Sequence, residues 1–429
     1  MGLAGLVAGL ANMGFHFVIA RDAGSATYGA VAALIPIGTT AAFLATGTEY
    51  TVARITILHR GPAERLLPRA LAAVFPWVLV SALLLALSGP LAAYLHLGSF
   101  VPVALSDFLF CAVMIGAAAT GILVGRGLFP VIIVLQLVAA FLRLGGGALL
   151  GRGQGAVTGA IAASVIPAVV VSCVGLLVAI RARPREGAVA VPAADRLKSV
   201  TGEGVSRALL AACLLGAWSL PLAFARHYLG AAQAGNFAAA QLLASGLVFA
   251  GATLVQLVYP SVARRPGRDR VVAGVGATLA LCMGSAAALA FAGPALVGAL
   301  FGGAFSDGTA VLAALSASAA TTVLAILALW MVRALGRYVF VAYVGIGAAV
   351  PTELLVGTLW HTGAVAIALG PALAVCMGFL GTLAVSTVMA RRIPRPLNAV
   401  IDVIGRQQPV DLDTAPSRRV LQAAGIDEP

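Results

Sequence analysis

The segment LALSGP at residues 85–90 returns as LAFAGP at residues 289–294, 204 positions later. After each copy, an apolar stretch runs to a Gly-x-Phe sequence, at 98–100 and at 303–305. Four further matches occur in the same order with offsets of 206 to 211: Gly24-x4-Gly29 with Gly230-x4-Gly235, Val-Ala-Arg at 52–54 with 262–264, Gly-Arg at 125–126 with 336–337, and Gly-Ala-Val at 155–157 with 363–365. These matches predict two copies of one structural unit.

The composition indicates a membrane protein. Hydrophobic residues make up 61% of the 429 residues and charged residues only 10%, whereas a soluble domain carries about 25% charged residues. Twelve apolar segments are long enough to cross a hydrocarbon layer of about 30 Å as helices. They lie near 2–20, 27–51, 70–90, 101–124, 128–150, 156–180, 205–226, 236–260, 271–293, 308–332, 338–360 and 364–390.

The distribution of basic residues predicts the orientation. Of the 27 Lys and Arg, 23 fall in one alternate set of connections. The opposite set holds only Arg21, Arg152 and Arg226, and Arg143 lies within a segment. Basic loops stay in the cytoplasm, so both termini are expected inside, and the net charge of +12 reflects topology and not nucleic-acid binding.

The expected fold is an all-α polytopic membrane protein with 12 transmembrane helices in two parallel six-helix lobes. Because six is even, both lobes enter the membrane in the same direction and a pseudo-twofold axis along the membrane normal relates them. The expected division is an N-terminal lobe at 1–180, a cytoplasmic linker at 181–204, a C-terminal lobe at 205–390 and a cytoplasmic tail at 391–429. Two lobes with a cleft between them suit alternating access.

The hairpin FHFVIARDAGSATYGAVAAL at 15–34 resembles the first hairpin of the polysaccharide exporters, or lipid-linked oligosaccharide flippases, of the multidrug/oligosaccharidyl-lipid/polysaccharide superfamily. In that family an aromatic-rich first helix ends in Ala-Arg, and a Gly-x3-Tyr-Gly loop opens the second helix. The matching residues here are Ala20, Arg21, Gly24, Tyr28 and Gly29. Similar segments in the second half are YLGAAQAGNFAAAQLL at 228–243, VYPSVAR at 258–264, LFGGAF at 300–305 and RALGRY at 333–338.

The resemblance implies a flippase for polyprenyl-diphosphate-linked oligosaccharide or polysaccharide precursors in the bacterial cytoplasmic membrane, working without covalent chemistry. The partners implied are the lipid-linked glycan, membrane lipids, H⁺ or Na⁺ as a coupling ion, and glycan polymerases or glycosyltransferases. No cofactor is expected. The five cysteines lie in apolar segments without paired spacing, so neither disulfides nor a metal site is expected.

Two charges in mid-membrane are the first candidates for a substrate site, because each such charge is costly. Asp107 and Arg143 lie 19 and 17 residues from Arg126, which would place them at nearly one depth on adjacent helices. One interpretation is a buried ion pair that fixes helix register. The other is that Arg143 binds the diphosphate in the cleft while Asp107 orients its guanidinium group.

The remaining candidates lie in the first helix of each half and in the eleventh segment. Arg21, Arg226 and His16 are expected near the outer ends, where cations would attract a phosphate or, alternatively, extend to the interface. Glu353, next to Pro351, is a candidate for taking up a proton or cation to couple transport. Its alternative role is a hydrogen bond within its own lobe.

Other function classes would require other sequence features. A major-facilitator carrier would carry a Gly-x-x-x-Asp-Arg/Lys loop that the connection at 52–69 lacks. A cation-coupled multidrug exporter of the same superfamily usually has an acid within its first helix, and this helix has none before Asp22. A membrane enzyme would need a large outer loop with a catalytic set, which the short outer loops do not offer. A transport-inactive cell-envelope scaffold remains an alternative.

Overall fold

The computed structural model describes residues 2–58, 63–153, 155–181, 213, 215–264, 268–305, 309–335 and 347–392. Its regular secondary structure in these ranges is entirely helical. The first bundle contains α1 (Gly2–Ala33), α2 (Ile35–Leu58), α3 (Ala63–Ala86), α4 (Ser88–Tyr94), α5 (Val101–Gly125), α6 (Phe129–Leu150) and α7 (Ala156–Arg181). The second contains α9 (Pro221–Tyr228), α10 (Ala231–Arg264), α11 (Arg268–Phe301), η1 (Gly303–Phe305), α12 (Thr309–Leu335), α14 (Ala349–Leu359) and α15 (Ala364–Arg392).

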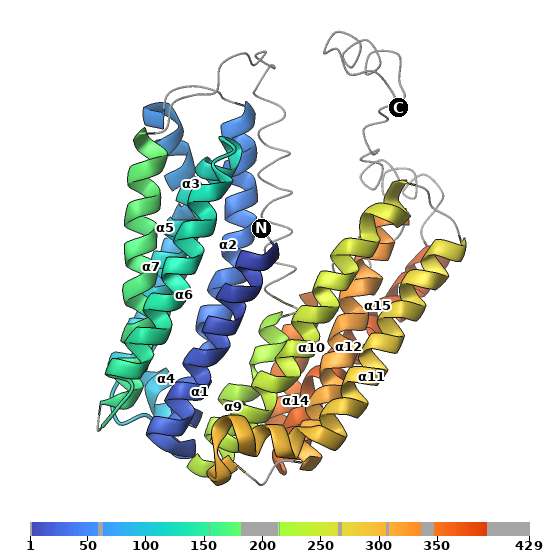
Figure 1. The fold of residues 1–429 in the computed structure, drawn as a ribbon. Coiled ribbons are helices and arrows are strands. Elements are labelled where there is room, and N and C mark those ends of the chain that lie inside the picture. Colours follow the sequence, from blue (N-terminus) through green and yellow to red (C-terminus); the bar gives the residue numbers. More distant parts are fainter. Residues whose placement is uncertain are drawn as a thin grey trace.

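We call these groups the N bundle (α1–α7) and the C bundle (α9–α15). In the N bundle, α2 and α7 pack against α5, and α6 packs against α1 and α7. In the C bundle, α12 contacts α10, α11 and α15, and α14 packs against α15. The two bundles meet where α1 contacts α9, α10 and α11, and they diverge toward the opposite end (Figure 1).

Long apolar helices with outward-facing hydrophobic side chains make this a multi-pass membrane protein. On α3 alone, Phe75, Leu79 and Leu83 are 59–61% exposed, which suits lipid and not water. Within the described ranges, six helices are long and apolar enough to span a membrane, or up to eight if each of two bent pairs is one span. The number of twelve therefore stays a prediction, as does the placement of both termini inside.

Gly24 interrupts α1, with φ of 78° and ψ of 171°. A side chain is strained at this positive φ, so glycine is the residue that allows the chain to break helix 2–23 from helix 25–33. Gly29, five residues later, lies directly against the start of α10. A Cβ atom added to Gly29 would lie 2.8 Å from the backbone nitrogen of Gly235. The paired glycines of the repeat thus meet each other across the two bundles.

The contacts around this crossing are reciprocal. Arg21 of α1 donates to the carbonyl of Ala299 in the C bundle. Arg226, 205 positions later, donates from its Nε to the carbonyl of Leu95 at 3.1 Å, and Leu95 precedes Ala299 by 204 positions. In a twofold arrangement, if a residue of the first unit contacts a residue of the second, the equivalents of these two residues in the other units also contact each other. This contact pattern is the one that a pseudo-twofold axis through the crossing produces.

We call this region the seam: residues 21–29 and 94–97 of the N bundle with residues 226–235 and 299–305 of the C bundle. The predicted linker at 181–204 lies outside the described residues apart from Arg181. The predicted tail at 391–429 does so apart from its first two residues. The lobe boundaries therefore stay predictions.

Candidate transport site

Arg143 lies inside the N bundle, where α6 packs against α1 and α7. Its Nε donates to the hydroxyl of Ser164 on α7 at 3.0 Å, and its Nη1 donates to Oδ1 of Asn12 on α1 at 3.1 Å. Its guanidinium carbon lies 4.3 Å from the centre of the Phe15 ring, a cation–π distance. The guanidinium group is therefore oriented by neutral groups on two neighbouring helices.

Glycines on α6 allow this close packing. A Cβ atom on Gly147 would lie 2.6 Å from the ring of Phe15, and one on Gly146 would lie 3.1 Å from the Cβ of Ala163. Because α1 and α7 both approach α6 here, the side chains at 12, 143 and 164 can reach one another. The run of three glycines at 145–147, next to Arg143, thus helps to position the arginine.

His16 and Tyr28 extend this polar cluster toward the seam. The His16 ring stacks edge-on against Phe15 and lies 6.1 Å from the Tyr28 ring, centre to centre. Tyr28 is fully buried and His16 is 8% exposed. In the described part of the chain, Nδ1 of His16 and the Tyr28 hydroxyl have no hydrogen-bond partner. His16, a predicted candidate, thus lies close to Arg143.

The predicted contact between Asp107 and Arg143 is wrong. Asp107 accepts a hydrogen bond from the Ser81 hydroxyl at 2.8 Å, on α3, and forms no ion pair with Arg143. Equal depth fixes only the height of a side chain, and the direction it points depends on which helices are neighbours. Helix α5 packs against α2, α3 and α7, and α6 packs against α1 and α7. The two side chains therefore point into different interfaces.

Glu353 lies in α14 and is fully buried against α15. A Cβ atom on Gly370 would lie 2.6 Å from one carboxyl oxygen of Glu353, so this glycine makes the space for the acid. Neither carboxyl oxygen has a hydrogen-bond partner among the described residues. The structure places Glu353 within the C bundle, apart from Arg143 and its neighbours in the N bundle.

Arg21 and Arg226 both lie at the seam. Besides Leu95, Arg226 reaches the carbonyls of His96 at 3.4 Å and of Ala26 at 3.5 Å. The next residue, His227, stacks against the Tyr94 ring at 3.9 Å and donates from its Nδ1 to the Tyr94 carbonyl at 2.7 Å. Both arginines thus tie the bundles together in this conformation.

Tyr94, whose ring stacks on His227, lies at the end of α4, after the apolar span of α3. Burial, together with the neighbouring Tyr228 hydroxyl, raises the pKa of Tyr94 to about 12. The phenol is therefore neutral near pH 7, and its neighbour Tyr228 belongs to the C bundle.

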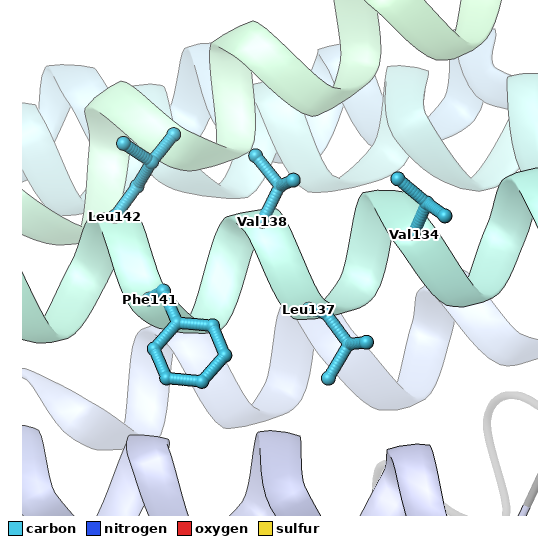
Figure 2. Close-up of a pocket in the computed structure, with 5 residues that line it drawn as sticks. All are labelled: Val134, Leu137, Val138, Phe141 and Leu142. Atoms are coloured by element: carbon cyan, nitrogen blue, oxygen red, sulfur yellow. The ribbon is translucent and has the colours of Figure 1, made fainter.

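The face of α6 that points away from the bundle is apolar. Val134, Leu137, Val138, Phe141 and Leu142 line a hollow of about 400 Å³ on this face (Figure 2). Phe141 is 55% exposed and Val134 is 58% exposed. Arg143 is the next residue after this row, so α6 presents a hydrocarbon surface on one side and a guanidinium group on the other.

The sequence did not single out Asn12, Ser164 or Tyr28 as site residues. Asn12, Phe15 and His16 follow the i, i+3, i+4 spacing of one helix face, which could have identified Asn12 as a neighbour of His16. Nothing in the sequence indicates Ser164, because serine is common in membrane helices and its contact depends on how α7 packs. The described residues contain no group of three or more His, Cys, Asp or Glu that could hold a metal ion.

The fold matches solved structures of membrane transporters. The lipid II flippase MurJ in an inward closed conformation has a TM-score of 0.69 and 12% identity, covering 90% of this chain and 87% of that chain. An inward-facing multidrug resistance MATE family transporter of the MOP superfamily has a TM-score of 0.66 and 15% identity, covering 90% and 96%. A MOP superfamily transporter from Pyrococcus furiosus, described as having a binding pocket of reverse polarity, has a TM-score of 0.53 and 15% identity, covering 90% and 94%.

No protein-family model matches the sequence, and no curated protein matches it significantly. Sequence identities of 12–15% indicate a shared fold and do not indicate a shared substrate. The chain therefore has the fold of the MOP superfamily transporters, which include multidrug transporters and a lipid flippase.

Proposed function

We propose that this protein is a flippase or exporter that moves a lipid-linked (polyprenyl-diphosphate) oligosaccharide or polysaccharide precursor across the bacterial cytoplasmic membrane by alternating access. The polar head would pass between the bundles while the polyprenyl tail stays in lipid. The protein would act without covalent chemistry. Glycan polymerases or glycosyltransferases are the proteins that we expect to supply or consume the substrate.

The observation that carries this proposal is the charge of the N-bundle site. Arg143 is held by a serine and an asparagine, and no carboxylate of the described residues forms an ion pair with it. An arginine without an acidic partner favours an anion and repels a cation. This polarity suits a diphosphate head group better than a cationic drug.

The seam supplies the moving part of the proposed mechanism. The contacts across the seam are the hydrogen bonds of two arginines, stacked aromatic rings and the close approach of Gly29 to Gly235. They can separate without breaking the packing inside either bundle. With the basic loops inside, the seam lies at the outer side, so this conformation would be open to the cytoplasm. When the seam opens, Arg21 and Arg226 lose their carbonyl partners and become available to the phosphates.

The apolar outer surface of α6 is a further argument for an amphiphilic substrate. The apolar hollow over 134–142 offers a hydrocarbon surface on α6, the helix that carries Arg143 on its opposite side (Figure 2). A tail lying there would let the head group approach Arg143 and His16 without drawing the tail out of lipid. Asp107, bound to Ser81 in another interface, is proposed only as a more distant part of the path.

A second candidate function is a cation-coupled exporter of drugs or other small molecules. Glu353 favours it, since a buried carboxyl group without a partner is a place where a proton or Na⁺ can bind. The same residue could equally couple the flippase to an ion gradient. A transport-inactive scaffold would tolerate the loss of both Arg143 and Glu353, which either transporter would not.

The test is complementation of a flippase-deficient polysaccharide strain, scoring lipid-linked precursor inside and polymer outside. Arg143→Ala is compared with Arg152→Ala, because Arg152 is an exposed arginine of the same bundle whose ion pair with Asp22 lies outside the site. Rescue by wild type and Arg152→Ala, but not by Arg143→Ala at equal membrane levels, would support the proposal. Rescue by all three would remove Arg143 from the path.

A further inference from the structure

Two buried polar side chains of the N bundle, His16 and Tyr28, lie near Arg143 and have polar atoms without a hydrogen-bond partner. Arg143 lies over the Phe15 ring, the His16 ring packs against Phe15 at 5.1 Å, and the Tyr28 ring lies 6.1 Å from that of His16, centre to centre. Within the described ranges, Nδ1 of His16 and the Tyr28 hydroxyl have no hydrogen-bond partner. Buried polar atoms without a partner are rare, and each marks strain or an absent water or ion.

The cluster also carries an uncompensated positive charge. Asp22, at the end of the same helix as His16, is paired with Arg152 at 2.7 Å. Asp107 is bound to Ser81. A buried cation costs several kcal/mol unless a charge or strong acceptor compensates it. The two bonds from Arg143 go to neutral oxygens, which stabilise the guanidinium group without neutralising it.

We infer that Arg143, His16 and Tyr28 form a binding site for a small, singly charged anion, with chloride as the probe. The Arg143 guanidinium group, the His16 Nδ1–H tautomer and the Tyr28 hydroxyl are the donors. One negative charge neutralises the single positive charge of Arg143. The Phe15 ring covers the guanidinium plane, so the anion binds at its edge.

The position of Tyr28 connects this site to the seam. The Tyr28 ring lies 5.9 Å from the Phe301 ring and 6.2 Å from the Phe305 ring, both of the C bundle. An anion that holds the hydroxyl also holds the ring against these two phenylalanines. Anion binding therefore stabilises the closed seam. This inference does not depend on the proposed function, because an inorganic anion can bind whether the cargo is a lipid-linked glycan or a drug.

The test uses the purified full chain in nanodiscs, with sodium chloride exchanged for sodium gluconate at constant ionic strength. The measured quantities are the thermal unfolding midpoint and the binding of radioactive chloride. Chloride should raise the midpoint in a saturable way, as a ligand of the folded state does. Tyr28→Phe keeps the ring and removes only the hydroxyl, so affinity should fall about tenfold or more, the equivalent of one hydrogen bond to a charged group.

Arg143→Gln should abolish the chloride response, while Arg152→Gln, the matched arginine control, should keep it. If Arg143→Gln does not fold, the shift in affinity with Tyr28→Phe decides the matter. Equal midpoints in chloride and gluconate for the wild type would overturn the inference and assign a water to the cluster. Wild-type affinity in both Tyr28→Phe and Arg143→Gln would also overturn it, because chloride would then bind elsewhere.

Discussion

The close approach of Gly29 and Gly235 at the seam provides the most quantitative prediction. A Cβ atom on Gly235 would lie 2.5 Å from the carbonyl carbon of Ser25, whereas ordinary contact begins at 3.4 Å. The obstacle is backbone, so no side-chain rotation relieves it, and α10 must move away from α1 by about 1 Å. Overpacking of this kind costs about 1–3 kcal/mol. If the strain exists only while the seam is closed, Gly235→Ala shifts the equilibrium toward the open seam by about 5- to 150-fold.

The assay is a distance distribution between spin labels at Ser99 and Ala232, which are exposed positions on the two sides of the seam. The labels are introduced in a background without the five native cysteines. Gly235→Ala should move population from the short to the long distance, and Gly29→Ala should do so more weakly because its contacts are wider. Gly246→Ala, on the same helix with no atom within 4 Å, is the matched control. Identical distributions for all three variants would refute the reasoning.

Three further changes follow from the same contacts. Glu353→Gln replaces an unpartnered acid by a neutral amide, so the thermal unfolding midpoint should stay equal or rise. Any dependence of transport on H⁺ or Na⁺ should be lost. Transport that keeps its ion dependence would contradict the coupling role. Asp107→Asn keeps an acceptor for Ser81, so transport in vesicles should be nearly unchanged. A loss as large as that of Arg143→Ala would show that Asp107 acts on the substrate as directly as Arg143 does. Arg226→Gln removes three carbonyl contacts and should favour the open seam about tenfold in the same label pair; an unchanged distribution would show that these contacts are weak.

The internal repeat could be recognised in the sequence because the close approach of two backbones at the seam requires glycine, and the contacts to backbone carbonyls require arginine. Gly29 and Gly235 face each other, and Arg21 and Arg226 make reciprocal contacts, so both copies keep these residues at nearly one offset. Hydrophobicity predicted the membrane helices for a related reason, since lipid-facing surfaces must be apolar along their whole length. These features depend on local chemistry that each segment carries itself.

The packing of the site could not be read in the same way. A helix in lipid can be apolar on every side, so the sequence does not indicate which face of α5 or α6 meets which neighbour. The predicted meeting of Asp107 with Arg143 failed for this reason. The burial of Glu353 beneath Gly370 depends on how α14 packs against α15, which no sequence period indicates.

The most direct test of the flippase proposal is movement of a fluorescent polyprenyl-diphosphate oligosaccharide across proteoliposomes that contain the purified protein. The account predicts that wild-type protein moves this anionic lipid, and that Arg143→Ala moves it far more slowly while Arg152→Ala does not. A neutral analogue without the diphosphate should stay in its leaflet. Failure to move the lipid, together with export of a cationic dye by the same vesicles, would contradict the proposal and favour the drug exporter.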